Sequence, residues 1–220
     1  MDTSQYVTFQ KFNDKLAAEE LAQLFKLNYI DFLFEDVSAN FDVTFANNEI
    51  DQDFRIKLKK QDFERANLLL INLSEKEVEN AGSEHYLFDF STEELIEIIE
   101  RQDEWSKFDF VLAKKLLKAR GVDLSEESID SFKQERIVEL SKPQKTPLLF
   151  ICIGYVLAIF GGLIAAIFGW YLKIHKKTLP NGEKVFYYAN STRIHGERIL
   201  IIGIISFIFW LVIKFSNLVV

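Results

Sequence analysis

Residues 148–172 read LLFICIGYVLAIFGGLIAAIFGWYL, an uncharged run that decides how this chain is organised. A helix of that length spans about 37 Å, enough to cross a hydrocarbon core of about 30 Å with some tilt. Trp170 and Tyr171 stand at one end, where aromatic rings favour the headgroup level, and Pro143 and Pro147 mark the other end. We predict that this run forms a transmembrane helix.

A second apolar segment, residues 199–213, reaches a full span only if the Lys214 side chain extends toward the headgroups. With both helices the chain would be a multi-pass protein of the bacterial cytoplasmic membrane. We expect residues 1–147 and both termini in the cytosol, and the connector 173–198 outside. The count of Lys and Arg on the two sides does not decide this orientation. Asn181-Gly182 between strand-prone flanks predicts a small β-hairpin in this connector.

Small residues recur every four positions along the first apolar run, in two adjacent rows. Such rows let helix backbones approach closely in lipid. They predict packing either on the chain's own second helix or on a membrane-protein partner or second copy of the chain. A further alternative is that the two adjacent glycines break the helix into a re-entrant turn. The predicted packing residues are Gly154, Ala158, Gly161, Gly162, Ala165, Ala166 and Gly169.

The charge is divided unevenly between the two parts of the chain. Residues 1–147 carry 19 Lys+Arg and 31 Asp+Glu, a net charge of −12, whereas residues 148–220 carry 7 and 2, a net charge of +5. An acidic region without a basic stripe argues against nucleic acid as a partner. The only cysteine, Cys152, excludes an intramolecular disulfide.

Residues 1–90 alternate between strand and helix patterns. Strands are predicted at 6–12, 29–37, 54–58 and 85–90, with amphipathic helices after the first and third. The order βαββαβ predicts an α+β fold, a ferredoxin-like domain with a four-stranded antiparallel sheet. Residues 41–48 predict an additional hairpin arm. The acidic and amide side chains around that arm lack the spacing of a calcium-binding loop.

Two stretches of this domain resemble a family of prokaryotic signal-transducing domains, which are small ferredoxin-like modules. The stretches are FNDKLAAEELAQLF at 12–25 and FRIKLKKQDFERANLL at 54–69, within a resemblance that covers about residues 6–74. The connection 37–53 is long for the family. The resemblance implies a sensing or adaptor role and brings no catalytic residues.

Residues 91–147 predict a helical extension, which either packs on the exposed side of the sheet or forms a stalk to the membrane region, residues 148–220. Ser91 and Glu94 form a capping-box pattern that opens its first helix. Trp105 and Phe108 lie in the turn before the second helix. We interpret these two side chains as an anchor, either into the sheet of the chain's own fold or into a partner.

No known catalytic or cofactor-binding motif occurs in the sequence. His175 and His195 flank the connector, but two histidines with few carboxylates make a poor zinc site. We therefore expect no enzyme, cofactor or metal. The leading hypothesis is a non-enzymatic inner-membrane sensor or adaptor that binds a small ligand or a protein and couples to a membrane partner. The alternative is a structural accessory subunit of a larger membrane complex.

Overall fold

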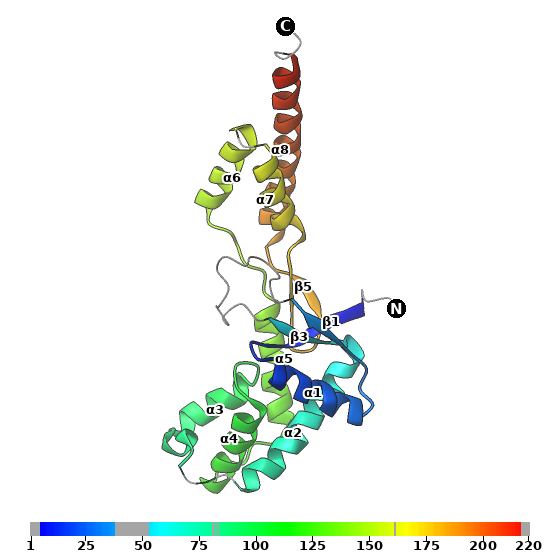
Figure 1. The fold of residues 1–220 in the computed structure, drawn as a ribbon. Coiled ribbons are helices and arrows are strands. Elements are labelled where there is room, and N and C mark those ends of the chain that lie inside the picture. The colour runs from blue at the N-terminus through cyan, green and yellow to red at the C-terminus, as the bar shows by residue number, and fades with distance from the viewer. Residues whose placement is uncertain (1–4, 38–52, 81, 83, 161, 217–220) are drawn as a thin grey trace. The chain divides into compact units, whose positions relative to one another are not determined.

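The computed structural model describes residues 5–37, 53–80, 82, 84–160 and 162–216, and the predicted hairpin arm at 41–48 lies outside these ranges (Figure 1). The chain divides into two compact units. Unit 1 comprises residues 1–140 together with the loop 178–183, and unit 2 comprises residues 141–177 and 184–220.

The first part of unit 1 is a three-stranded antiparallel sheet in the order β1-β3-β2, formed by Tyr6–Phe12, Phe54–Lys59 and Phe32–Asp36. Alternate residues of β3 are buried, so its Arg and Lys side chains occupy the opposite face. A bulge in β1 between Thr8 and Gln10 gives Phe9 a position in the core.

Two helices complete this core: α1 (Lys15–Leu27) and α2 (Phe63–Glu79), the latter preceded by the 3₁₀ helix η3 (Lys60–Asp62). The Asp14 side chain caps α1 by accepting a hydrogen bond from the backbone N–H of Leu16. Phe25 is fully buried, and Phe9 packs edge-on against both Phe25 and Phe63, with centroid separations of 5.7 and 5.2 Å. The amphipathic patterns of both helices are confirmed.

The predicted ferredoxin-like fold is wrong, because residues 85–90 do not form a fourth strand. Tyr86–Asp89 is a short 3₁₀ helix, η4, in which the His85 ring nitrogen accepts a hydrogen bond from the Leu87 N–H. Leu87 is fully buried in a helical core, whereas Tyr86 and Phe88 are exposed. The aromatic alternation that predicted a strand therefore comes from a helical turn, and helices dominate the described fold.

That second core belongs to α3 (Thr92–Glu100), α4 (Lys107–Ala119) and α5 (Glu126–Ser141), packed with the end of α2. The capping box is confirmed: the Ser91 hydroxyl accepts from the Glu94 N–H, and the Glu94 carboxylate accepts from the Ser91 N–H. Helix α4 ends before Gly121, whose φ of 83° is a conformation that glycine adopts easily.

Unit 2 contains α6 (Leu148–Phe160), α7 (Leu163–Ile174), the hairpin strands β4 (Lys176–Thr178) and β5 (Lys184–Phe186), and α8 (Asn190–Ser216). The predicted hairpin turn at Asn181-Gly182 is confirmed, with Gly182 at a φ of 77°. The predicted connector 173–198 ends differently, because its last nine residues belong to α8.

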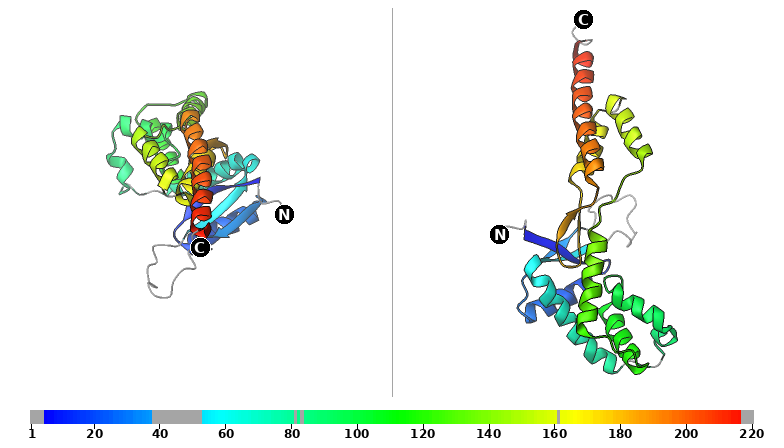
Figure 2. Two further views of the ribbon diagram at one scale, coloured as in Figure 1. Left: turned by 90° about the horizontal axis from the view of Figure 1, so that it is seen from above. Right: turned by 180° about the vertical axis from the view of Figure 1, so that it is seen from behind.

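The predicted continuous helix over 148–172 is also wrong. The chain turns at Gly162, whose φ of 43° and ψ of −90° are not helical, and α7 returns beside α8 (Figure 2). Among the described residues one helix, Asn190–Phe215, is long and apolar enough to span a membrane, whereas α6 and α7 are shorter apolar helices. The alternative of a break in this helix is the one that the structure shows, at Gly162.

Candidate functional site

Glycine-to-glycine contacts hold α7 against α8. A Cβ atom added at Gly169 would lie 2.5 Å from the carbonyl oxygen of Gly196, and one added at Gly203 would lie 2.7 Å from the carbonyl oxygen of Gly162. These separations are far below van der Waals contact, so no larger residue fits without moving a backbone. The two helices touch through their main chains.

The other predicted packing residues contribute to the same interior. Ala158 and Ala165 are fully buried, and Ala166 is almost so. A Cβ at Gly154 would meet the Ile199 side chain of α8 at 2.7 Å. Gly161 lies outside the described residues. The geometry therefore favours packing on the chain's own helix, one of the two alternatives left open by the sequence.

The sequence interpretation missed the partner glycines on α8. Gly196 and Gly203 are seven residues apart, which places them on one face of a helix, and both are buried. That spacing was a usable signal. It predicts the close approach only when the turn at Gly162 is known, because the turn brings α7 back alongside α8.

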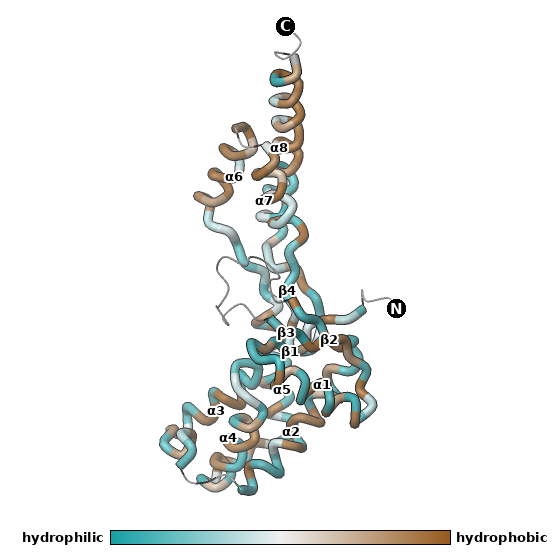
Figure 3. The backbone as a smooth tube through the Cα atoms, in the orientation of Figure 1, coloured by the Kyte–Doolittle hydropathy of each residue, from teal (hydrophilic) through white to brown (hydrophobic). Residues whose placement is uncertain are grey.

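Helices α6 and α7 and most of α8 are hydrophobic along the chain (Figure 3), and many of their large apolar side chains are exposed. Only 11% of the most apolar 18-residue window of α8 is buried within the chain, although its mean hydropathy is 2.3. Contiguous exposed apolar surface of this kind marks contact with lipid or with another protein. Its largest members include Phe150, Phe160, Ile164, Ile167, Trp170, Ile205, Phe209 and Val212.

The predicted anchor residues, Trp105 and Phe108, line a cleft of about 1090 Å³ in unit 1. Both side chains are half-buried because they also pack against the helical core. Among the described residues their intrachain contacts are with the helical core and not with the core of the sheet, and each also borders the cleft. Further apolar lining comes from β1, α1, α2, α5 and the loop 178–183 and includes Phe12, Leu21, Leu24, Leu70, Leu73, Leu140 and Leu179.

Two polar side chains near Trp105 in the sequence line the cleft, and one of them has a buried nitrogen without a hydrogen-bond partner among the described residues. The Nε2 atom of Gln102 is buried without a hydrogen-bond partner among the described residues. Burial lowers the pKa of the half-buried Lys107 ammonium, the nearby charge of Lys133 lowers it further, and Asp103 opposes both. Both side chains line the cleft and offer N–H donors to an occupant.

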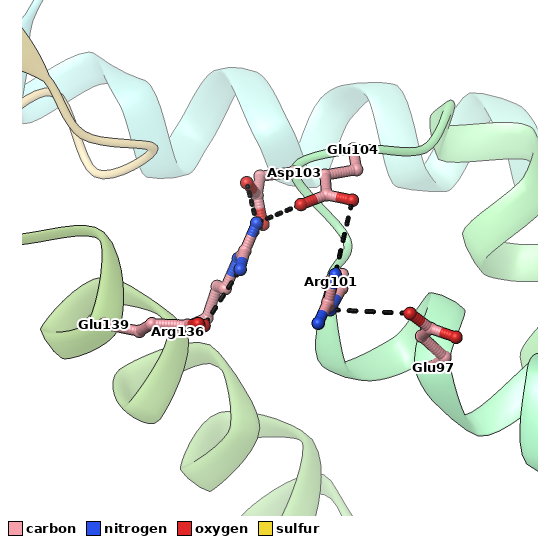
Figure 4. Close-up of polar contacts among 6 residues, drawn as sticks. All are labelled: Glu97, Arg101, Asp103, Glu104, Arg136 and Glu139. Carbon is pink, nitrogen blue, oxygen red and sulfur yellow. Dashed lines mark hydrogen bonds and ion pairs between the residues drawn. The ribbon is translucent and has the colours of Figure 1, made fainter.

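A network of ion pairs fixes the turn that carries Trp105 (Figure 4). The Nε atom of Arg136 on α5 donates to Asp103 at 2.9 Å, its Nη1 atom donates to Glu139 at 2.9 Å, and its Nη2 atom also contacts Glu104. The Arg136 side chain is only 11% exposed, and the hydrogen bond with Asp103 raises its pKa. The guanidinium therefore bridges α5 to the turn between α3 and α4.

A second polar cluster lies on the sheet. Asp31 accepts hydrogen bonds from Lys59 at 2.7 Å and from the Tyr6 hydroxyl at 2.6 Å, and these bonds lower the pKa of its carboxyl group. Lys57 pairs with Glu35 across the β2–β3 ladder at 2.7 Å. These paired surface charges are typical of a solvated sheet face and supply no catalytic arrangement.

The histidines of the connector do not converge on a common site. The His175 ring stacks on Tyr171, and the Nδ1 atom of His195 hydrogen-bonds the Tyr155 hydroxyl at 3.1 Å. Within the described part of the chain, no group of three His, Cys, Asp or Glu residues is placed to hold a metal ion.

Comparison of the chain with models of protein families, with curated proteins and with solved structures finds no match.

Proposed function

We propose that the chain is a non-enzymatic, membrane-anchored adaptor in which α8 crosses the bilayer once. The observation that carries the proposal is the exposed apolar surface of α8, which is long enough to span and is covered by its own chain along one side only. Exposure of this apolar surface is favourable in the hydrocarbon core of a bilayer and unfavourable in water.

The lengths of α6 and α7 argue that neither crosses alone. Their 13 and 12 residues correspond to about 20 and 18 Å, against a hydrocarbon core of about 30 Å. As a hairpin they enter and leave on the same side. At the turn, the Trp210 Nε1 of α8 donates a hydrogen bond to the Ile159 carbonyl at 3.5 Å. This bond gives a partner to one backbone carbonyl at the end of α6, where lipid offers no donor.

This hairpin changes the expected orientation. If α6 and α7 return to one side, residues 128–147 and 173–198 lie on that side with ten Lys and Arg, four and six respectively. Lys214 alone lies toward the other. The positive-inside rule then places unit 1 and the connector in the cytosol and the end of α8 outside.

The cleft in unit 1 supports the adaptor role. We propose that it receives an amphipathic, cationic segment of a partner protein. Trp105 and Phe108 offer an apolar wall, while Glu20 and Glu77 supply negative charge to the lining. Gln102 offers its unpaired donor to a carbonyl oxygen of the occupant. A half-buried aromatic anchor in such a setting is typical of an interaction hot spot.

Cysteine labelling in intact cells tests the topology. In a Cys152→Ser background, Lys184→Cys should resist a membrane-impermeant maleimide and Lys214→Cys should react. Carbonate washing should leave the full chain in the membrane fraction. Labelling of Lys184→Cys from outside would instead support two full spans, and extraction by carbonate would refute the membrane anchor.

Photo-crosslinking tests the adaptor role. A photoreactive residue at Leu24, inside the cleft, should form a discrete adduct with a partner, and Trp105→Ala should abolish it. Leu16 on the same helix is exposed and does not line the cleft, so it provides the matched control. Absence of an adduct at Leu24, or equal adducts at both positions, would reject the cleft as a docking site without affecting the topology.

A further inference from the structure

Eight cationic side chains of unit 2 lie in four segments: the residues before α6, the end of α7, the β4–β5 hairpin and the start of α8. We call them the basic collar: Lys142, Lys145, Lys173, Lys176, Lys177, Lys184, Arg193 and Arg198. The ninth cation of the unit, Lys214, lies at the opposite end of α8. Unit 2 contains one carboxylate side chain, Glu197, so the collar carries a large excess of positive charge.

Hydrogen bonds bring these segments together. Gln144 donates its backbone N–H to the Tyr187 carbonyl at 2.8 Å and accepts from the Ala189 N–H at 2.8 Å. The Lys177 ammonium donates to the Lys142 carbonyl at 3.0 Å, and the Arg193 Nε donates to the Lys173 carbonyl at 3.1 Å. The segments that carry the collar are therefore held together by hydrogen bonds within unit 2.

Aromatic rings are interleaved with these cations. His175 lies within stacking or edge contact of Tyr171, Tyr187 and Tyr188, with centroid separations of 4.5 to 6.2 Å. The Cζ atom of Arg193 lies 3.3 Å from the centroid of the Phe186 ring. Tyrosine beside Lys and Arg at the base of apolar helices is the composition of a membrane interface.

Among the described residues, little of the positive charge of the collar is neutralised by ion pairs. Lys173 pairs with Glu197 at 3.0 Å, and this is the one ion pair that the described residues give any collar cation. Backbone carbonyls hold Lys177 and Arg193 without cancelling their charge. Lys142, Lys145, Lys176 and Lys184 are exposed.

We propose that the basic collar binds the head groups of anionic phospholipids in the cytosolic leaflet. The inference rests on the proposed membrane anchor and adds a lipid class to it. Its basis is charge complementarity together with continuity, because α6, α7 and α8 leave the collar as exposed apolar helices. Free phosphate is not the intended ligand, since the exposed lysines of the collar are spread over several segments of unit 2.

Trp170, near the end of α7, provides the readout. In a Trp105→Phe and Trp210→Phe background, the full chain is placed in nanodiscs of phosphatidylcholine with a small fraction of brominated lipid. Brominated phosphatidylglycerol should quench Trp170 several-fold more strongly than brominated phosphatidylcholine at the same mole fraction. The preference should fall at high ionic strength and should persist in millimolar inorganic phosphate.

Charge variants give the decisive comparison. Replacing Lys142, Lys145, Lys176 and Lys184 together by Gln should reduce the relative affinity for phosphatidylglycerol at least tenfold, since each such cation contributes about fivefold. The same four positions replaced by Arg should retain the preference. Lys214→Gln, at the other end of α8, is the matched control and should change nothing.

Two outcomes would overturn the proposal. Equal quenching by the two lipids, in a chain that stays in the membrane after carbonate washing, would refute the collar and leave the anchor intact. Equal loss in the Gln and Arg variants would show that packing and not charge is responsible. Extraction by carbonate would instead show that the anchor itself is wrong, and the collar proposal would fail with it.

Discussion

Unit 1 and unit 2 use large apolar side chains in opposite ways. In unit 1, Phe25, Ile56 and Leu95 are fully buried and charged residues cover the outside. In unit 2, glycine and alanine fill much of the helix interface, whereas Phe160, Ile164 and Ile205 face outward. Burial of apolar area stabilises the first unit in water, but it gives little advantage between helices in lipid, where close backbone packing counts. The contrast indicates that unit 1 is adapted to water and unit 2 to lipid.

The sharpest way to break this comparison is to fill the glycine contact. Gly169→Val places side-chain atoms where the Gly196 carbonyl and the Leu200 N–H now lie, both 2.5 Å from an ideal Cβ. We expect a loss of about 3 kcal/mol, the upper range for overpacking. Unfolding of the full chain by SDS titration in mixed micelles measures it. Ile167→Val on the exposed face should shift the midpoint little. An unshifted midpoint for Gly169→Val would remove glycine packing as the basis of unit 2.

The same contrast explains which elements the sequence predicts. The alternation of β3, the Ser91 cap and the Asn181-Gly182 turn depend on neighbours a few residues away, and all three are confirmed. The break at Gly162 also has a local sequence signal, the two adjacent glycines. It is fixed, however, by the approach of Phe207, whose Cα lies 3.0 Å from an ideal Cβ at Gly162. Contacts between such distant residues leave no local pattern.

The candidate sites follow the same division. The small-residue rows and the Trp105–Phe108 pair are visible in composition and spacing, and the structure places both at interfaces or clefts. The basic collar is not visible, because its cations come from segments up to 56 residues apart, from Lys142 to Arg198. The sequence places Tyr171 at the headgroup level and Tyr187 and Tyr188 in a strand-prone flank, with nothing to join them. Only the return of α7 brings them together.

Within unit 1 the comparison is sharpened by charge. Arg136→Ala removes a guanidinium that is 11% exposed and leaves Asp103, Glu104 and Glu139 without it. We expect unit 1 to lose about 2 kcal/mol, as for charged hydrogen bonds in a partly buried setting. Hydrogen exchange of residues 101–106 in the full chain measures it. Arg101→Ala removes exposed pairs at 3.6 and 4.0 Å and should cost at most about 0.5 kcal/mol. Equal effects would show that the ion pairs of Arg136 contribute no more to stability than exposed surface pairs.

The smallest effect has the opposite sign and concerns the end of α1. Ile30 donates its N–H to the Phe25 carbonyl at 2.9 Å and Tyr29 donates to Lys26 at 3.3 Å, the hydrogen-bond pattern of a Schellman motif. Tyr29 occupies the position that favours glycine, with a φ of 56°, while its side chain is 89% exposed. Tyr29→Gly should therefore stabilise unit 1 by about 1 kcal/mol, since it relieves the strain and removes almost no buried surface.

Tyr29→Ala separates the two causes of that gain. Alanine also removes the ring but keeps the Cβ that makes a left-handed conformation costly, so it should leave stability nearly unchanged. Hydrogen exchange of α1 in the full chain reports both variants. If alanine stabilises as much as glycine, the gain comes from removing an exposed ring and not from the backbone. If glycine destabilises, the exposed Tyr29 side chain contributes to the stability of unit 1. Exposed as well as buried apolar side chains would then stabilise that unit.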